Sequence, residues 1–211
     1  MKFVAAMTVV IALFAAAPAS AQTRFFDVTA FYALVDPQGD NRPGLNAVDE
    51  FELDSTSGFG AAVNAFFTDK ISLELAAYAF ESEVTVRPRL VSQFPVRDLD
   101  MMPITATLQY HFNPEGRFDP YIGAGAAYVL FGDLSDFSGS DLRSIDLEDD
   151  IGYVLNAGAS FDLTPRLAIV GDVKYVPVES SARAVVTGAP EQTFDIEVNP
   201  LIVGLGLSYQ F

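Results

Sequence analysis

The sequence contains no cysteine, no tryptophan and a single histidine, His111, among its 211 residues. Without cysteine the chain forms no disulfide, no thiolate metal site and no thiol nucleophile. Bases are also scarce, because 12 Lys and Arg stand against 28 Asp and Glu, for a formal net charge of −16. A nucleic-acid partner requires a basic face to meet phosphate, so we expect no nucleic-acid binding.

Long apolar runs are missing after the first residues, although half of the chain is hydrophobic and 18 Phe and 8 Tyr are present. This apolar content argues against disorder. No stretch after residue 17 reaches the 18 apolar residues that suggest a spanning helix. If the exported chain spans a membrane, it must therefore do so as a closed β-barrel, which also satisfies every backbone group in lipid.

The first 21 residues have the layout of a secretory signal peptide. Lys2 precedes the apolar run Phe3 to Ala17, and the small residues Ala19-Ser20-Ala21 follow. The run is shorter than the ~20 residues that a transmembrane anchor requires, which favours a cleaved signal over an anchor. We expect cleavage after Ala21, so that residues 22–211 form the exported protein.

The rest of the chain alternates between apolar and polar residues in segments of about ten, which predicts β-strands. The separators alternate between short and long, as in bacterial outer-membrane barrels with short periplasmic turns and long outer loops. Eight strands are expected: Phe25 to Val35, Phe59 to Phe67, Ile71 to Phe80, Met102 to Phe112, Tyr121 to Phe131, Ile151 to Phe161, Leu167 to Val178, and Leu201 to Phe211.

Periodicity alone does not distinguish a soluble sandwich, with its apolar face inside, from a membrane barrel, with its apolar face outside. The signal peptide, the terminal Phe211 and the aromatic residues at segment ends favour the barrel, because aromatics form girdles at both membrane interfaces. The predicted fold is therefore an all-β, eight-stranded antiparallel transmembrane β-barrel in the bacterial outer membrane. The expected girdle residues are Phe25, Phe26, Tyr110, Phe112, Tyr121, Phe131, Tyr153, Phe161, Tyr209 and Phe211.

Several segments resemble the outer membrane protein W family. The most specific is Pro120-Tyr121-Ile122-Gly123-Ala124-Gly125-Ala126-Ala127-Tyr128, and the likeness covers most of residues 100–211. Residues 22–100 match only in layout, and the sixth segment starts Asp150-Ile151-Gly152, where members often have an aromatic residue before the glycine. The resemblance implies a narrow, rather apolar lumen that passes small hydrophobic molecules, with lateral release into the bilayer and no catalysis. Tyr209 and Phe211 resemble the signal that the barrel assembly machinery recognises.

The strand phases predict which residues line the lumen. Eight glycines point inward, and they either leave a passage or let large neighbours pack across them. These are Gly58, Gly60, Gly123, Gly125, Gly152, Gly158, Gly204 and Gly206. The apolar residues expected inside are Phe66, Tyr78, Phe80, Val129, Phe131 and Val154, with Phe80 and Phe131 near the outer mouth.

Four charged residues are also expected inside: Asp27, Glu74, Asp172 and Lys174. An isolated charge in a narrow lumen is costly, so Lys174 is the expected partner of Glu74 or Asp172. Two interpretations remain open, a structural lumen network and a gate that constricts the pore.

Catalytic chemistry and cofactors are not expected. A lipid A deacylase uses a His–Ser pair near the outer leaflet, whereas His111 ends a descending strand near the periplasm. Pairing of His111 with Ser208 or Ser160 remains an alternative. The acidic residues of one long separator lack the spacing of a calcium loop, which favours a solvated loop. They are Asp133, Asp136, Asp141, Asp146, Glu148, Asp149 and Asp150.

The sequence thus predicts a barrel that gives small hydrophobic molecules passive passage. The alternative is a closed structural or receptor barrel whose acidic outer loops bind surface partners. Membrane lipid, lipopolysaccharide, the barrel assembly machinery and small hydrophobic solutes are the expected partners.

Overall fold

The fold is taken from a computed structural model that describes residues 25–38, 48–53, 55–88, 94–132, 134–135, 142–147, 150–186 and 192–211. No helix in this described part is long and apolar enough to cross a membrane. The predicted signal peptide, residues 1–21, lies outside the described residues, as do Asp133, Asp136, Asp141, Glu148 and Asp149 of the acidic separator.

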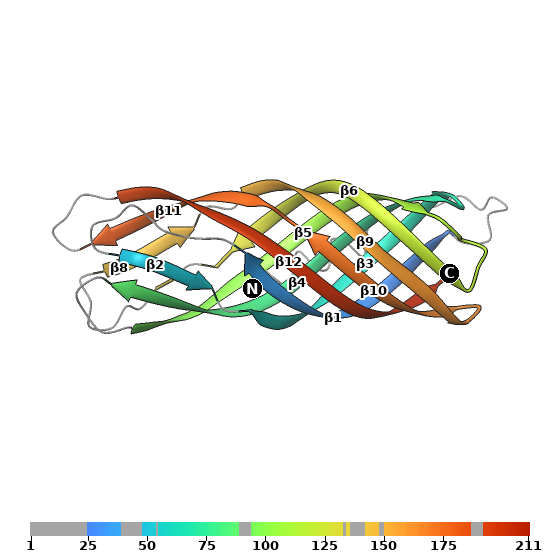
Figure 1. Cartoon of the computed structure of the whole chain (residues 1–211), viewed down its shortest axis with the longest axis horizontal. Helices are drawn as coiled ribbons and strands as arrows, with labels where there is room; N and C mark the ends of the chain where they lie inside the picture. Colours follow the sequence, from blue (N-terminus) through green and yellow to red (C-terminus); the bar gives the residue numbers. More distant parts are fainter. Residues whose placement is uncertain are drawn as a thin grey trace.

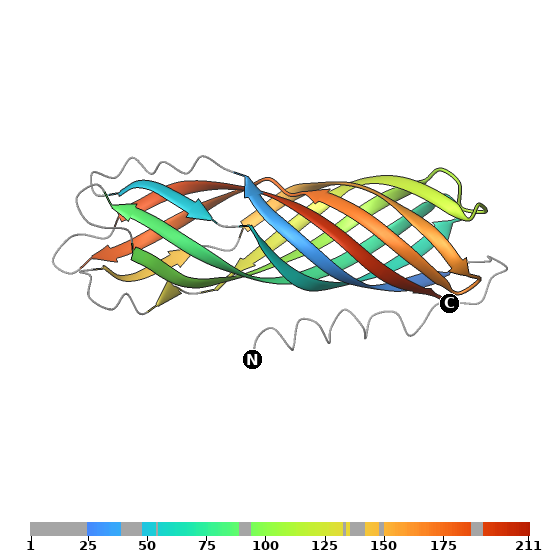
Figure 2. The ribbon, with the colours of Figure 1, turned by 60° about the horizontal axis from the view of Figure 1, so that its bottom comes forward.

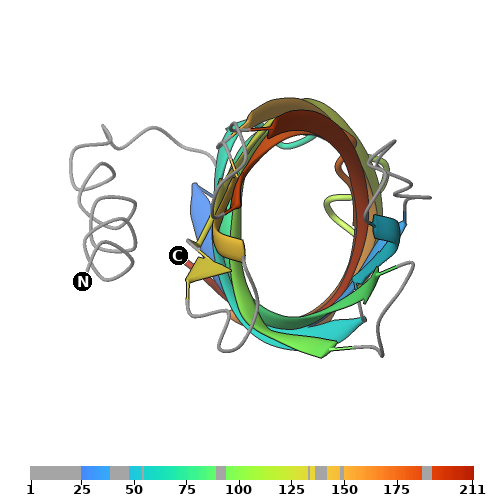
Figure 3. The ribbon, with the colours of Figure 1, turned by 90° about the vertical axis from the view of Figure 1, so that its left-hand side faces the viewer.

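Eight antiparallel strands form a closed ring, seen nearly end-on in Figure 3. Each strand pairs with the next, and the first and last strands close the ring in a register that runs from Asp27–Gln210 to Gln38–Asn199. The predicted eight-stranded barrel is therefore correct. Its strands are β1 (Phe26–Gln38), β3 (Thr56–Thr68), β4 (Ile71–Pro88), β5 (Phe94–His111), β6 (Phe118–Phe131), β9 (Asp150–Thr164), β10 (Leu167–Tyr175) and β12 (Gln192–Gln210).

One end of the barrel continues well beyond the predicted strand ends, as Figures 1 and 2 show. The strands β4, β5 and β12 reach 18, 18 and 19 residues. Four further strands lie at this extended end: β2 (Val48–Leu53), β7 (Leu134–Ser135), β8 (Leu142–Leu147) and β11 (Val178–Val186). The expectation that the long separators are loops was wrong, because these strands lack the continuous apolar face on which the prediction depended.

The opposite end carries three short turns that local side chains fix in place. The hydroxyl of Thr68 accepts hydrogen bonds from the N–H groups of Lys70 and Ile71, at 3.3 and 3.0 Å. Thr164 accepts two in the same way in a second turn. Such hydroxyl-to-backbone bonds are typical of tight turns. We call this the short-turn end.

Apolar side chains cover the outside of the ring. Phe59 and Ile151 are each 72% exposed, while the polar side chains of the same strands point inward. Burial is thus the reverse of that in a soluble sandwich. One predicted girdle residue, Tyr121, was assigned to the wrong side, because it is buried inside. Phe131, which was expected both in the girdle and inside, packs half-buried against the interior core. Tyr121 shares the inward phase of Gly123, which the girdle assignment overlooked.

Candidate functional site in the barrel interior

The barrel interior changes from polar to apolar along its axis. On β4, Ser72 and Glu74 lie toward the short-turn end, and Tyr78 and Phe80 lie toward the extended end. On β1, β5 and β12 the polar side chains also lie toward the short-turn end. The buried apolar cluster includes Phe31, Val35, Tyr78, Phe80, Met101, Val129, Val154 and Ile202. The interior therefore has a polar half and an apolar half.

The predicted inward glycines all lie on the interior side, and large neighbours pack across several of them. A Cβ atom added to Gly60 would meet the ring of Tyr78, and one added to Gly58 would meet backbone and the ring of Phe80. The ring of Phe31 likewise covers two glycines of β12. Of the two interpretations, the structure has packing across the glycines rather than empty volume. The same holds at Gly158, Gly204 and Gly206, while Gly123 and Gly125 face the side chains and backbone of β5.

Lys174 pairs with both predicted partners. Its Nζ atom lies 2.7 Å from Oε1 of Glu74 and 2.7 Å from Oδ1 of Asp172, and its side chain has no exposed surface. The second carboxylate oxygen of Asp172 accepts hydrogen bonds from the Tyr121 hydroxyl at 2.7 Å and the Asn156 amide at 2.8 Å. Three of these four partners come from other strands, so the group ties several walls of the barrel together.

Amide side chains extend this group across the lumen. The side-chain N–H of Gln109 donates to Asn156 Oδ1 at 2.9 Å, and Asn64 donates to Gln109 Oε1 at 3.0 Å. A space beside this group, lined by Asp27, Asn64 and Gln109 among others, measures about 20 Å³. That is room for about one water molecule. We call Asn64, Glu74, Gln109, Tyr121, Asn156, Asp172 and Lys174 the polar plug.

Most members of the polar plug were not predicted. The inward phase that selected Glu74 and Lys174 also contains Asn64, Gln109 and Asn156, so their placement was available from the sequence. Because these amides carry no charge, nothing besides their phase indicated that they take part in the ion-pair network.

His111 pairs with Ser72, not with Ser208 or Ser160, so the predicted pairing was wrong. Its Nε2 lies 3.0 Å from Ser72 Oγ and its Nδ1 lies 2.7 Å from Asp119 Oδ2. Ser72 is on β4, which neighbours β5, whereas β9 and β12 do not pair with β5.

The order Ser72–His111–Asp119 matches that of a hydrolase triad. However, Ser72 has no exposed surface, and the rings of Phe66 and Tyr121 lie 5.0 and 5.3 Å from the imidazole. A substrate carbonyl cannot approach this hydroxyl without displacing those rings. The geometry therefore fits a hydrogen-bonded strut between strands rather than a catalytic site.

Aromatic rings fill the apolar half. Tyr78 stacks on Phe80 with ring centroids 6.0 Å apart, and Phe31 lies 6.0 Å from Tyr78. The predicted position of Phe80 near the outer mouth was wrong, because β4 continues beyond it to Pro88. The apolar half therefore lies in the middle of the tube.

The pairing of β4 with β5 is interrupted next to these rings. The register is continuous up to Ala77–Ile104 and resumes at Phe80–Met101, so Tyr78 and Ala79 are unpaired with β5. The backbone N–H of His111 donates to the carbonyl of Lys70. In the same register, the backbone nitrogen of Pro103 is the one that faces the carbonyl of Tyr78. Proline has no N–H to donate, which explains the interruption.

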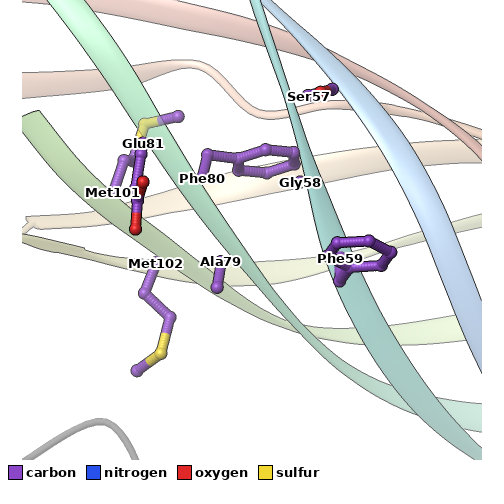
Figure 4. A pocket seen from close by; sticks show the side chains of 8 residues that line it. All are labelled: Ser57, Gly58, Phe59, Ala79, Phe80, Glu81, Met101 and Met102. Atoms are coloured by element: carbon purple, nitrogen blue, oxygen red, sulfur yellow. The ribbon is translucent and has the colours of Figure 1, made fainter. Parts of the chain in front are cut away.

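A pocket of about 470 Å³ lies at this interruption. Its lining includes the inward-facing Gly58, Phe80 and Met101 together with the outward-facing Phe59 and Ala79. Figure 4 shows Phe80 directed toward Gly58, and Ala79, Met102 and Phe59 directed toward the other side of the sheet. Residues of both faces of the barrel wall therefore line this pocket.

Metal binding gains no support from the described residues, where no three Asp, Glu or His side chains are grouped to hold an ion. Asp150 is half-buried at the start of β9, and its Oδ1 accepts the N–H of Ile151 at 2.7 Å.

Three known proteins resemble this chain in sequence or in structure. Outer membrane protein W of Vibrio cholerae is 31% identical over 210 residues, which cover 96% of this chain and 96% of that protein. Outer membrane protein AlkL of Ectopseudomonas oleovorans is 34% identical over 116 residues, or 55% of this chain and 49% of its own. The solved structure of AlkL superimposes with a TM-score of 0.60 at 25% identity and covers 93% of this chain and 94% of that chain.

The crystal structure of OprG from Pseudomonas aeruginosa superimposes with a TM-score of 0.78, covering 89% of this chain and 96% of that chain. At 24% identity this likeness concerns the fold. The family model for OmpW matches residues 24–211. The chain therefore belongs to the OmpW family of bacterial outer-membrane β-barrels.

Proposed function

We propose that the protein gives small hydrophobic molecules passive passage from the outside into the outer membrane. The solute enters the apolar half of the lumen and leaves sideways through the interruption between β4 and β5. The pocket at this interruption carries the proposal, because its lining runs from Phe80 and Met101 inside to Phe59 outside. Short turns of outer-membrane barrels face the periplasm, which puts the apolar half above the polar plug.

The polar plug supports a sideways route over an axial one. An apolar solute moving down the axis would separate Lys174 from Glu74 and Asp172. It would also have to pass the space beside Glu74, Gln109 and Tyr121, which leaves room for about one water. Removing one partner from a buried ion pair costs ~3–5 kcal/mol. At the interruption, by contrast, Pro103 has no N–H to donate to β4, so one backbone hydrogen bond fewer opposes the solute.

The charged residues predicted as a gate act in this scheme as a permanent seal. Asp27, Glu74, Asp172 and Lys174 hold the periplasmic half closed to ions and water, and the solute enters only the apolar half. A hydrophobic solute therefore crosses without a leak along the axis.

The position of the C-terminal residues supports the predicted assembly signal. Tyr209 and Phe211 lie exposed at the short-turn end, and Phe211 stacks on Phe26 with ring centroids 4.5 Å apart. We infer that the barrel assembly machinery binds these aromatics before β1 and β12 close the ring. We also propose that the strands at the extended end contact lipopolysaccharide.

A closed structural barrel is the second candidate. The packing of Tyr78, Phe80 and Phe31 across the glycines favours it, because these rings occupy the space that a solute would use. In that case the acidic outer segments would provide the binding function.

Probe uptake by intact cells separates the two candidates. An apolar dye that fluoresces only in lipid is added to cells with and without the protein, and ion conductance is recorded in planar bilayers. Faster dye uptake without ion conductance supports the proposed function. Equal dye uptake in both strains supports the closed barrel.

A further inference from the structure

A groove of about 610 Å³ lies on the outside of the barrel at the short-turn end, between the first two turns. Ile71, Tyr110 and Phe112 form its apolar wall, and the rings of Tyr110 and Phe112 meet edge to face at 5.2 Å. These two side chains are 43% and 52% exposed. The groove has no part in the proposed route, because it lies at the periplasmic interface, where lipid chains meet headgroups.

Lys70 lines this groove, and it is the one of the three turn bases whose charge makes no contact with another described residue. Each of the three short turns has one base: Lys70, Arg117 and Arg166. Arg117 Nε donates to the carbonyl of Asp162 at 2.9 Å, and its guanidinium lies over the ring of Phe161.

Arg166 donates to the Tyr209 hydroxyl at 3.4 Å. Within the described part of the chain, the ammonium of Lys70 has neither an ion pair nor a side-chain hydrogen bond. Its charge is therefore available to a ligand.

Two exposed carboxylates, those of Asp69 and Glu115, line the same groove as Lys70. Neither makes an ion pair with another described residue. A cation beside two anions complements a headgroup that carries both charges. The Lys70 ammonium suits a phosphate, and the carboxylates suit an ammonium that donates hydrogen bonds. An anionic headgroup would be repelled by the carboxylates, and a quaternary ammonium has no N–H to donate.

We propose that this groove binds a phospholipid with a phosphate and a primary-ammonium headgroup, phosphatidylethanolamine, from the inner leaflet of the outer membrane. The phosphate binds Lys70, the ammonium binds Asp69 and Glu115, and one acyl chain lies along Ile71, Tyr110 and Phe112. The site anchors the periplasmic end of β4 and β5 in the bilayer.

The absence of tryptophan gives a clean test. Phe112→Trp puts a single fluorophore in the groove, and Phe161→Trp puts one at a neighbouring turn as a control. Each variant is placed in phosphatidylcholine vesicles that contain phosphatidylethanolamine, phosphatidylcholine or phosphatidylglycerol with brominated chains, which quench tryptophan on contact. Brominated phosphatidylethanolamine should quench Trp at position 112 at about fivefold lower mole fraction than the other two lipids. The control position should show no preference.

Lys70→Gln in the Phe112→Trp background should abolish this preference, and Arg166→Gln should leave it intact. Retained mobility of the folded form on unheated gels verifies that both variants are assembled. Equal quenching by all three lipids, or a preference that survives Lys70→Gln, overturns the proposal. A preference for phosphatidylglycerol also overturns it, because the two carboxylates would then have no part.

Discussion

The Nζ atom of Lys174 lies 2.7 Å from Oε1 of Glu74 although their strands, β10 and β4, are four places apart in a ring of eight. The ion pair therefore crosses the full width of the lumen. Asp172 joins it from the same strand as Lys174, which leaves one ammonium between two carboxylates. This arrangement makes the polar plug a brace as well as a seal.

Loss of the ammonium should destabilise the barrel strongly. Lys174→Met leaves Glu74 and Asp172 buried without a cation, so the free energy of unfolding should fall by ~3–5 kcal/mol. Urea titration in detergent micelles, read by the gel mobility of the folded form, measures the change. The double variant Glu74→Gln/Lys174→Met should lose less than Lys174→Met alone. A loss below ~1 kcal/mol for Lys174→Met would show that the pair carries little stability.

The buried strut should affect stability and not lipid chemistry. His111→Ala removes one partner each of Ser72 and Asp119, and the loss of these hydrogen bonds should cost ~1–3 kcal/mol. Ser72→Ala removes one side of the strut and should cost less. A fluorophosphonate probe should not label Ser72, and the acyl chains of lipid A should stay unchanged. Labelling that Ser72→Ala abolishes would contradict the structural role.

Widening the polar plug should open the axis to ions. Gln109→Ala/Tyr121→Ala removes two large side chains around the space of about 20 Å³ and should give measurable ion conductance in planar bilayers. The parent protein should give none. Tyr110→Ala, on the outward face of β5, is the matched control and should behave like the parent. If the double variant also fails to conduct, the seal lies elsewhere in the barrel.

Alternation predicted the barrel and the inward phase of its strands, because a membrane barrel imposes one period on every strand. The same rule applied to Tyr121 would have placed it inside, opposite Asp172. Pairings across the lumen were harder to predict. The contact of His111 with Ser72 depends on which strands are neighbours and on their register, neither of which the alternation encodes.

The outer strands escaped prediction for a different reason. β4 continues to Pro88, and β5 begins at Phe94. The residues of these extensions do not keep an apolar face. Outside the bilayer a hairpin needs no lipid-facing side, so the signal that defines a membrane strand disappears there.

Restoring the missing backbone donor should close the interruption. Pro103→Val supplies an N–H that the register directs at the carbonyl of Tyr78. The new hydrogen bond should add ~0.5–1.5 kcal/mol to the free energy of unfolding and lower the rate of apolar dye uptake. Urea titration and the cell assay measure the two effects. A more stable variant with unchanged uptake would argue against the sideways route.

A reversible staple across the interruption tests the sideways route most directly, since the chain has no cysteine of its own. Extending the register between the pairs Ala77–Ile104 and Phe80–Met101 sets Ala79 opposite Met102, so Ala79→Cys/Met102→Cys should form a cross-strand disulfide. Leu75→Cys/Ala106→Cys is the matched control where the pairing is intact. Oxidation of the first pair should reduce dye uptake to that of cells without the protein, and reduction should restore it, while the control staple should have no effect. Unchanged uptake with the first staple closed would contradict release between β4 and β5.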